Sequence, residues 1–244
     1  MQNTIAVNDP ATPPPRYTFD TIGVIHSPFK EKFGIPRQSG LMSAAQAQLE
    51  LLPPYARDEA VRGLDGFSHL WITFVFHGVR QGDWSPTVRP PRLGGNQRLG
   101  VFATRATHRP NPIGLSVVEL IGIKREQGRL LLQLRGADLM DGTPVLDIKP
   151  YVPYVDSVPT ARAGFAANAP PPRLQVAFAP EAEAVCVQRP PLREFIVQML
   201  QYDPRPAYRG DEEPGRVYGV RVFDCNVRWR VAGDAAQVIA IDPA

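Results

Sequence analysis

Four side chains that can bind an anion lie within seven residues of one another: Arg105, His108, Arg109 and Asn111. Asn111 lies between two prolines, which fix their own φ and keep the preceding residues out of the helical region. The segment is therefore predicted to be a stiff loop. Guanidinium groups held in such a loop suit the binding of a carboxylate or a phosphate. A proline-rich surface loop with solvated arginines would have the same pattern.

A second group of polar residues is Asp141-Gly142-Thr143. Asp-Gly is a strong hairpin signal, so this segment is predicted to be a turn between two strands. A carboxylate here can shape the turn, hold a ribose or an adenine edge, or accept a proton. Asp147 and Lys149 alternate in the next predicted strand, so they are expected on one face of it, where they can form an ion pair.

Prolines and glycines divide the chain into short segments, and most of these have the composition of strands. Helices are predicted in two places. Ser43 can cap a helix over 44–52, and apolar residues at helical spacing follow Pro191, which suits a first turn. No strand runs into a glycine-rich turn and a helix, which argues against the common nucleotide-binding α/β fold. The predicted strands are 17–26, 71–77, 100–104, 115–123, 129–136 and 145–152, and the apolar helical residues are Leu192, Phe195, Ile196, Met199 and Leu200.

The composition is that of an ordinary globular protein, with 244 residues, 43% hydrophobic and 21% charged. The pattern predicts a mostly β protein with two domains. No apolar run is long enough to span a membrane and no leader peptide is visible, so the cytoplasm is the expected location. Cys186 and Cys225 lack metal-ligand spacing, and we expect reduced thiols and no metal. The expected division is a disordered lead-in over 1–16, a first domain over 17–157, a linker over 158–172 and a small α+β domain over 173–244.

The net charge is only +3, but the charge is unevenly distributed. The segment from Arg80 to Arg109 contains six arginines and a single acid, Asp83. Such a basic stretch favours an anionic partner such as RNA. Near the C-terminus, cationic and aromatic residues alternate, a mixture that can stack on bases and follow phosphates, although pairing with nearby acids would look the same. These C-terminal residues are Arg205, Tyr208, Arg209, Arg228, Trp229 and Arg230, and the nearby acids include Asp203 and Asp224.

Five ordered blocks of sequence resemble one known family, the TsaA-like S-adenosylmethionine-dependent tRNA methyltransferases that act on N6-threonylcarbamoyladenosine. Two further segments near the C-terminus, 203–209 and 226–230, resemble the long bacterial form. The resemblance covers roughly 18–242. It implies that the first domain is a compact antiparallel β-barrel that binds the cofactor. The five blocks are His26–Leu41, Gly63–His77, Val88–Asn96, Val101–Ser116 and Asp138–Tyr151.

The resemblance and the chemistry of the side chains together suggest roles for individual residues. Arg105, just past a predicted strand, is expected to hold the methionyl carboxylate of S-adenosylmethionine or a nearby charge, and Leu115 to pack on its adenine. Asp141 and Asn111 are the candidate catalytic residues, and His69 is expected in the core or behind the site. The full expected cofactor set is Gln38, Ser39, Gly40, His77, Gly78, Arg105, Leu115, Asp141, Gly142 and Thr143. The expected substrate set is Arg109, Lys149, Arg205, Tyr208, Arg209, Arg228 and Arg230.

The predicted function is therefore methyl transfer to N6 of threonylcarbamoyladenosine next to the tRNA anticodon. The resemblance implies a homodimer with cofactor sites at or near the subunit interface. Two alternatives remain open at this point. One is a methyltransferase that acts on a small molecule, and the other is a non-catalytic module that binds S-adenosylmethionine or RNA. The basic, aromatic C-terminal region argues against the small-molecule enzyme.

Overall fold

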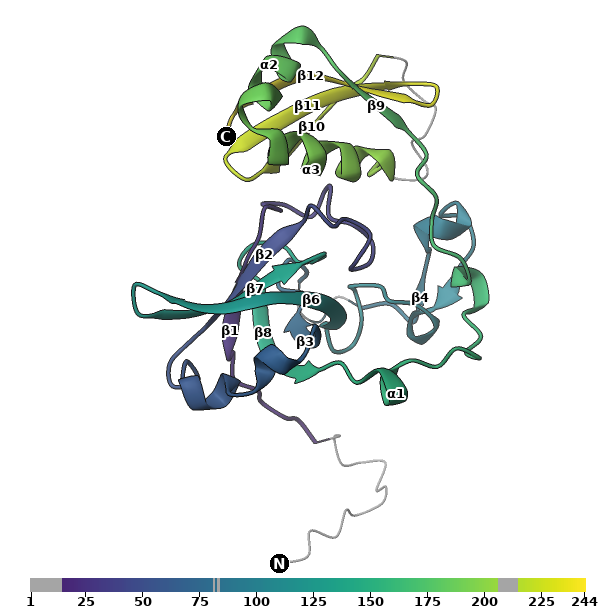
Figure 1. Cartoon of the computed structure of the whole chain (residues 1–244). Helices are drawn as coiled ribbons and strands as arrows, with labels where there is room; N and C mark the ends of the chain where they lie inside the picture. Colours follow the sequence, from purple (N-terminus) through teal and green to yellow (C-terminus); the bar gives the residue numbers. More distant parts are fainter. Residues whose placement is uncertain (1–14, 81, 83, 206–214) are drawn as a thin grey trace, which may run out of the picture.

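The computed structural model describes residues 15–80, 82, 84–205 and 215–244. Six strands of the first domain close into a barrel in the order β1-β2-β7-β6-β3-β8, with every neighbouring pair antiparallel (Figure 1). The mostly β architecture predicted from the sequence is confirmed. The strands are β1 (Gly23–His26), β2 (Gln46–Leu51), β3 (His69–Val75), β6 (Ile113–Glu126), β7 (Arg129–Arg135) and β8 (Pro144–Pro150).

Alternating burial along the strands builds the barrel core. In β3, Leu70, Ile72 and Phe74 point inward and are at most 4% exposed, while the residues between them are half-buried. This is the period of two that a sheet with one buried face requires. The β6–β7 hairpin closes at Gln127-Gly128, where both residues have positive φ (49° and 80°), as a tight two-residue hairpin turn needs.

Residues 80–112 form most of the connection between β3 and β6, which we call the insert, and its described residues have little regular structure. Its proline and glycine content breaks up any longer strand or helix. A short two-stranded ribbon, β4 (Thr87–Val88) with β5 (Leu99–Gly100), is its only sheet among the described residues. The short helical turns of the first domain and linker are η1 (Asp58–Val61), η2 (Leu64–Gly66), η3 (Pro91–Leu93), η4 (Val101–Ala103), α1 (Pro153–Asp156) and η5 (Gly164–Ala166).

The C-terminal domain is a four-stranded sheet with two helices (Figure 1). The strand order is β10-β11-β12-β9, and only the β12–β9 pair is parallel. The helix predicted around residues 192–200 is confirmed: its five apolar residues are all buried, and proline occupies its first turn. The elements are β9 (Gln175–Phe178), α2 (Pro180–Gln188), α3 (Pro190–Gln201), β10 (Val217–Val222), β11 (Cys225–Ala232) and β12 (Ala235–Pro243).

A segment of the first domain packs into the core of the second. Phe29 and Met42 are each 1% exposed and belong to the same apolar cluster as Phe195 and Trp229. The rings of Phe29 and Phe195 lie 5.3 Å apart. The barrel core is a separate cluster. Each domain therefore has its own core, but residues 28–45 contribute to the core of the C-terminal domain.

Two of the predicted elements are wrong. The helix predicted over 44–52 is strand β2, because Ala47, Leu49 and Leu51 alternate into the barrel core while the backbone pairs with both β1 and β7. The strand predicted over 100–104 is mostly the short helical turn η4. In both places the contacts that decide the conformation come from residues distant in the sequence, and local pattern does not contain them.

Two further predictions are only partly right, one in where a strand begins and the other in the type of a turn. The strand predicted over 17–26 is regular only from Gly23, and residues 15–22 have no regular structure. Asp141-Gly142 does form a turn, with Gly142 at φ 76°, but it is not a hairpin. It connects β7 to β8, and these strands are not neighbours in the barrel. The lead-in residues 1–14 lie outside the described part of the chain.

The state of the two cysteines and the search for membrane-spanning helices and metal-binding groups concern the chain beyond its fold. Cys186 and Cys225 are buried free thiols, as expected. Burial raises the pKa of both thiols, which keeps them protonated. Within the described ranges, no helix is long and apolar enough to cross a membrane, and no group of three or more His, Cys, Asp or Glu side chains is placed to hold a metal.

Candidate active site

The barrel topology brings the predicted cofactor residues to one rim. In an antiparallel barrel, alternate strands end and begin at the same rim. Here β1, β3 and β7 end at the rim where β2, β6 and β8 begin. The loops at this rim are 27–45, 76–112 and 136–143. They contain every predicted cofactor residue except Leu115.

The rim faces the C-terminal domain (Figure 1). The backbone N–H of Phe223 donates to the carbonyl of Pro28 at 2.9 Å, and Phe29 forms an isolated β-bridge with Val222. A hollow of about 490 Å³ lies at this junction, lined by residues that include His26, Asp141 and Phe223. The relative position of barrel and second domain is thus supported by backbone hydrogen bonds as well as by the shared core.

Arg105 and Gln38 come together at the rim, as predicted. The guanidinium Nη1 of Arg105 donates to the side-chain oxygen of Gln38. The backbone N–H of Gly40 donates to the carbonyl of Gly136 at 2.8 Å. A Cβ on Gly136 would lie 3.2 Å from the Gly40 Cα, and both residues have positive φ, so glycine is required for this close approach.

The same cluster contains an acid that the sequence analysis did not single out, Asp138. Its Oδ1 is buried and accepts no hydrogen bond from the described residues. Burial raises the pKa of Asp138, while hydrogen bonds from Ser116 and the Ser39 backbone and the charge of Arg105 act in the opposite direction. A buried carboxylate oxygen without a donor is costly, so this atom is suited to receive a cationic group of a ligand. In the sequence, the one sign that Asp138 could be a site residue is its position at the start of the Asp138–Tyr151 block.

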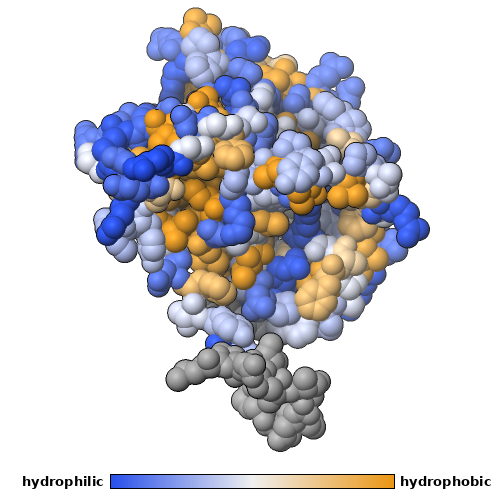
Figure 2. All heavy atoms as spheres, turned by 60° about the horizontal axis from the view of Figure 1, so that its bottom comes forward, coloured by the Kyte–Doolittle hydropathy of each residue, from blue (hydrophilic) through white to orange (hydrophobic). Residues whose placement is uncertain are grey.

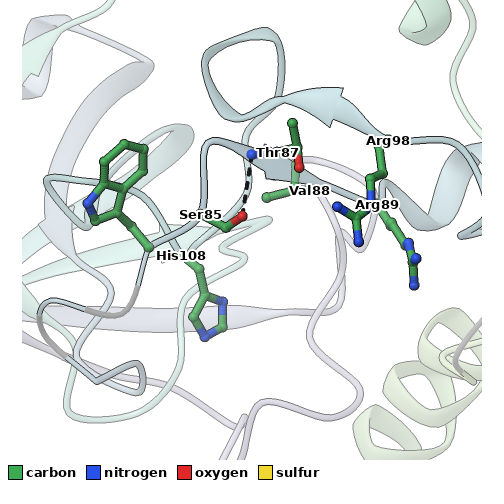
Figure 3. A pocket seen from close by; sticks show the side chains of 7 residues that line it. Ser85, Thr87, Val88, Arg89, Arg98 and His108 are labelled. Carbon is green, nitrogen blue, oxygen red and sulfur yellow. Dashed lines mark hydrogen bonds between the residues drawn. The ribbon is translucent and has the colours of Figure 1, made fainter.

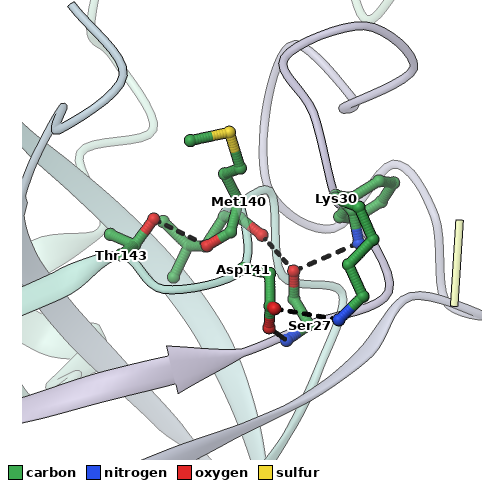
Figure 4. Close-up of polar contacts among 7 residues, drawn as sticks. Ser27, Lys30, Met140, Asp141 and Thr143 are labelled. Carbon is green, nitrogen blue, oxygen red and sulfur yellow. Dashed lines mark hydrogen bonds and ion pairs between the residues drawn. The ribbon is translucent and has the colours of Figure 1, made fainter. Parts of the chain in front are cut away.

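Asp141 lies in the same loop but makes different contacts (Figure 4). Its Oδ1 accepts the backbone N–H of Ser27 and its Oδ2 pairs with the Lys30 ammonium, each at 2.8 Å. Burial alone would raise the pKa of Asp141, but the hydrogen bonds from Lys30 and Ser27 lower it below the usual value. Thr143 donates to the carbonyl of Met140 at 2.7 Å and closes the turn. This carboxylate therefore ties the 138–143 turn to the segment that follows β1.

His77 and Gly78 follow β3 beside the same turn. A Cβ on Gly78 would lie 2.7 Å from the Lys32 side chain and 3.2 Å from the Met140 side chain, so these two side chains approach the backbone of Gly78. His77 is exposed. His69 is also exposed, with its Nδ1 2.9 Å from the Ser68 hydroxyl. The expectation that His69 lies in the core is wrong, because the first residue of β3 faces outward.

The segment from Arg105 to Pro112 is a loop, as predicted. Arg109 folds back on it and donates to the carbonyls of Thr104 and Ala106 at 3.2 and 3.4 Å. Asn111 is exposed, and its carbonyl accepts the N–H of Ile113 at 2.7 Å. Leu115 is 53% exposed on the outer face of β6. The neighbouring residue of β6, Ser116, points inward toward Asp138, so Leu115 does not lie against the Arg105–Asp138 cluster of its own chain.

Several predicted substrate residues have acidic or amide partners. Lys149 pairs with Asp147, which confirms the expected ion pair. Arg205 pairs with Asp203 at 2.7 Å and Arg228 with Asp242 at 2.9 Å. Arg230 donates to the side chain of Gln237 at 2.7 Å.

Of the remaining C-terminal residues, Tyr208 and Arg209 lie outside the described residues. Trp229 is fully buried and stacks on Phe33 and Tyr218, so the idea that it stacks on RNA is wrong. The alternation of arginines and Trp229 along β11 reflects the two faces of a strand, with the arginines outside and the indole in the core.

Fold and rim together define a β-barrel protein with a second, sheet-containing domain beside one charged rim. Residues 24–157 match the family model described as the tRNA-methyltransferase O N-terminal domain, and residues 171–244 match the TrmO C-terminal domain. The chain therefore belongs to the tRNA-methyltransferase O family.

Individual relatives agree with this assignment. A protein from Escherichia coli K12 named tRNA (adenine(37)-N6)-methyltransferase is 52% identical over 231 residues, which cover 93% of this chain and 98% of that protein. A crystal structure of TrmO from Pseudomonas aeruginosa is similar with a TM-score of 0.76 at 45% identity, over 93% of this chain and 98% of that one. A Pyrococcus abyssi protein named probable S-adenosyl-L-methionine-binding protein is 39% identical over 144 residues, 59% of this chain and 73% of that protein.

Proposed function

We propose that this protein transfers the methyl group of S-adenosylmethionine to N6 of adenosine 37 in tRNA, where that base carries the threonylcarbamoyl group. The observation that carries the proposal is the buried carboxylate of Asp138 on the barrel rim, which has an oxygen without a donor among the described residues and lies close enough to Arg105 to be affected by its charge. The name and near-complete coverage of the E. coli relative support the choice of reaction and substrate.

The charges at the rim fit the amino-acid end of the cofactor. That end carries a carboxylate and an ammonium on the same carbon. Arg105 supplies a guanidinium for the carboxylate, and the free Oδ1 of Asp138 supplies an acceptor for the ammonium. The glycine at position 40 leaves the backbone of 38–40 open to close approach. When bound, S-adenosylmethionine supplies a methyl group activated by the positive charge on its sulfur.

The acceptor nitrogen is a poor nucleophile, because the attached carbamoyl group withdraws its electron pair. Positioning must therefore contribute much of the rate enhancement. We propose that Asn111, exposed in the loop that Arg109 stiffens, orients the modified base. Asp141 acts in this proposal by holding the 138–143 turn against Ser27 and Lys30, since a carboxylate whose pKa is lowered is a weak proton acceptor.

A homodimer with a shared site forms part of the proposal. Ile113, Leu115 and Ile121 lie on the outer face of β6 and are 39%, 53% and 42% exposed. Apolar side chains gather on the face of the molecule shown in Figure 2. Exposed apolar strands of this kind favour association through a two-fold interface. A second copy is one way to bring Leu115 against a cofactor adenine, which its own barrel does not allow.

The decisive test is mass spectrometry of tRNA nucleosides from cells that lack the gene. We expect the methylated form of threonylcarbamoyladenosine to disappear and to return with the intact gene but not with Arg105→Ala. Unchanged nucleosides would contradict the assignment. Cofactor turnover that needs no RNA would indicate a small-molecule enzyme, and cofactor binding without any transfer would indicate a binding module.

Sedimentation at the working concentration tests the dimer separately. We expect Leu115→Glu to shift the protein to a monomer and to lower activity. A wild-type monomer with full activity would exclude a shared site.

A further inference from the structure

We propose that a hollow in the insert, separate from the Arg105–Asp138 cluster, binds an unpaired nucleotide that neighbours the target adenosine in the RNA. This inference rests on the proposed function and deepens it, because it names a site for the substrate. In the bound state, Trp84 stacks on the base, while Arg89 and Arg98 contact the phosphate. We call this feature the insert hollow and define it by Trp84, Thr87, Arg89, Arg98 and His108.

The insert hollow has the size and lining of a nucleotide site. Its volume is about 510 Å³, within the usual range for small-ligand sites. Figure 3 shows the imidazole of His108 on one side and the guanidinium groups of Arg89 and Arg98 on the other. Trp84 is 50% exposed, and among the described residues its indole has no ring or hydrogen-bond partner; most indoles are largely buried. Aromatic faces next to arginines are the combination that binds single-stranded RNA through stacking and phosphate contacts.

The positive charge of the insert is not neutralised within the described protein. None of its six arginines forms an ion pair with a described carboxylate. Asp83, the single acid of the insert, lies outside the described residues. Arg92 donates to the backbone carbonyl of Asn168, which leaves its charge uncompensated. Uncompensated guanidinium groups gathered on one loop attract an anionic partner from a distance.

The part of the insert hollow formed by the β4–β5 ribbon is held by backbone contacts and is therefore preorganised. Thr87 and Val88 pair with Gly100 and Leu99 in the ribbon. The N–H of Val101 donates to the carbonyl of Pro86 at 3.0 Å. Val101 itself is 1% exposed and anchors the base of the insert. A preformed hollow loses less conformational entropy on binding than a mobile loop would.

The insert hollow also lies within reach of the cofactor cluster. His108 lines it, and Arg105, three residues earlier, contacts Gln38 in that cluster. Successive Cα atoms are 3.8 Å apart, so the two Cα atoms are separated by at most about 11 Å. The loop 105–108 therefore joins the two sites, and a nucleotide next to the reacting base can reach the hollow.

The test uses full-length protein and a short RNA stem-loop that carries the modified target adenosine in its loop. Tryptophan fluorescence reports binding, since Trp229 is fully buried and Trp71 is half-buried with its N–H bonded to Asp156. We expect the RNA to quench wild-type emission. The Trp84 variants lack this reporter, so their affinity is measured by the anisotropy of a labelled stem-loop, and Trp84→Ala should bind about tenfold more weakly. Trp84→Phe should retain most of the affinity, because a phenyl ring still stacks.

The arginines are tested by Arg89→Gln with Arg98→Gln. We expect a higher KM for RNA, an unchanged kcat at saturating RNA and a salt slope of the binding constant lowered by about two. The matched control is Arg125→Gln, at the far end of the β6–β7 hairpin and paired with Asp58, which should bind RNA as wild type does (Figure 1). Cofactor affinity by calorimetry should be equal in all variants.

Three outcomes would overturn the inference while leaving the proposed function intact: normal RNA affinity in Trp84→Ala, an unchanged salt slope in the double variant, or equal losses in Arg125→Gln. A wild-type protein that binds the cofactor but neither binds nor methylates the RNA would instead contradict the proposed function. Tight binding of free phosphate without any effect of the RNA loop sequence would assign the hollow to a small anion.

Discussion

Two arginine-rich regions of this chain look alike in sequence and differ in structure. The arginines of the insert have no carboxylate partner among the described residues, whereas several of those in the C-terminal domain form ion pairs, such as Arg189 with Asp224 and Arg228 with Asp242. A carboxylate beside an arginine cancels much of the local positive potential and repels a phosphate, so a paired arginine attracts an anionic partner less than an unpaired one does. Charge composition alone therefore does not identify an RNA-binding surface, and the number of unpaired guanidinium groups is a better guide.

The aromatic residues of the two regions differ in the same way. Trp84 in the insert is half exposed, while Trp229 in the C-terminal sheet is fully buried with its ring stacked on Phe33. Trp229 lies between two arginines in the sequence, and Trp84 lies within the arginine-rich insert. The difference teaches that one indole is available to a ligand and the other supports the core.

The largest expected effect is on stability. Trp229→Ala should lower the free energy of unfolding by about 3–5 kcal/mol, because it leaves a large cavity in the shared core. Trp84→Ala should change it by no more than about 0.5 kcal/mol. Chemical denaturation followed by circular dichroism measures both. Equal losses in the two variants would remove the contrast between the buried and the exposed indole.

The next effect concerns the cofactor. Arg105→Ala should weaken S-adenosylmethionine binding by about 1.5–3 kcal/mol, the usual cost of a lost charge-assisted hydrogen bond. Arg105→Lys should recover little of this if two hydrogen bonds are made. Calorimetry with Arg228→Ala as the paired control should show no change in the control. A normal dissociation constant for both Arg105 variants would move Arg105 away from the cofactor.

A smaller effect separates Asp138 from Asp141 through pH. Because burial raises the pKa of Asp138, ionisation opposes folding, and stability falls as the pH rises through that pKa. Asp138→Asn should therefore be more stable than wild type by about 1 kcal/mol near neutral pH, yet bind the cofactor more weakly. The gain should vanish below the ordinary carboxyl pKa, where wild type is protonated in both states.

Asp141→Asn should show the opposite sign. Its pKa is lowered by Lys30 and the Ser27 N–H, so its contribution to stability is present above the ordinary carboxyl pKa and is lost as the pH falls through the lowered value. Unfolding curves measured across this range decide both cases. The same sign for the two variants would mean that the two carboxylates do not have the separate roles assigned here.

The smallest effect is expected from the C-terminal arginines. Arg228→Gln and Arg230→Gln should change RNA affinity less than about twofold, since each side chain already has a partner. The double variant Arg89→Gln, Arg98→Gln is the reference for a large loss. If the C-terminal variants lose as much affinity as the insert variants, pairing is not the property that separates the two regions.

Much of this molecule follows from local sequence. The strand-type composition of the segments that form β3, β6, β7 and β8 and the helical spacing of Leu192, Phe195 and Met199 predict elements that the structure confirms. The prolines around Asn111 predict the loop, and the ordered blocks lead to the family. These features depend on φ restriction and on the two periodicities of the backbone, and both are properties of neighbouring residues.

Tertiary structure decided the rest. Residues 46–51 have the composition of a helix and become β2 because β1 and β7 supply hydrogen bonds on both sides. In the sequence, Asp138 has the appearance of an ordinary acidic residue in a turn. Only the fold brings Ser116 and Arg105, which are distant from it in the chain, close to its carboxylate. Whether an arginine is paired depends on partners such as Asp242, fourteen residues away across a β-turn. Burial, ion pairing and strand neighbours depend on residues that are far apart in the sequence. The linear pattern of residue types does not say which of these residues become close in space.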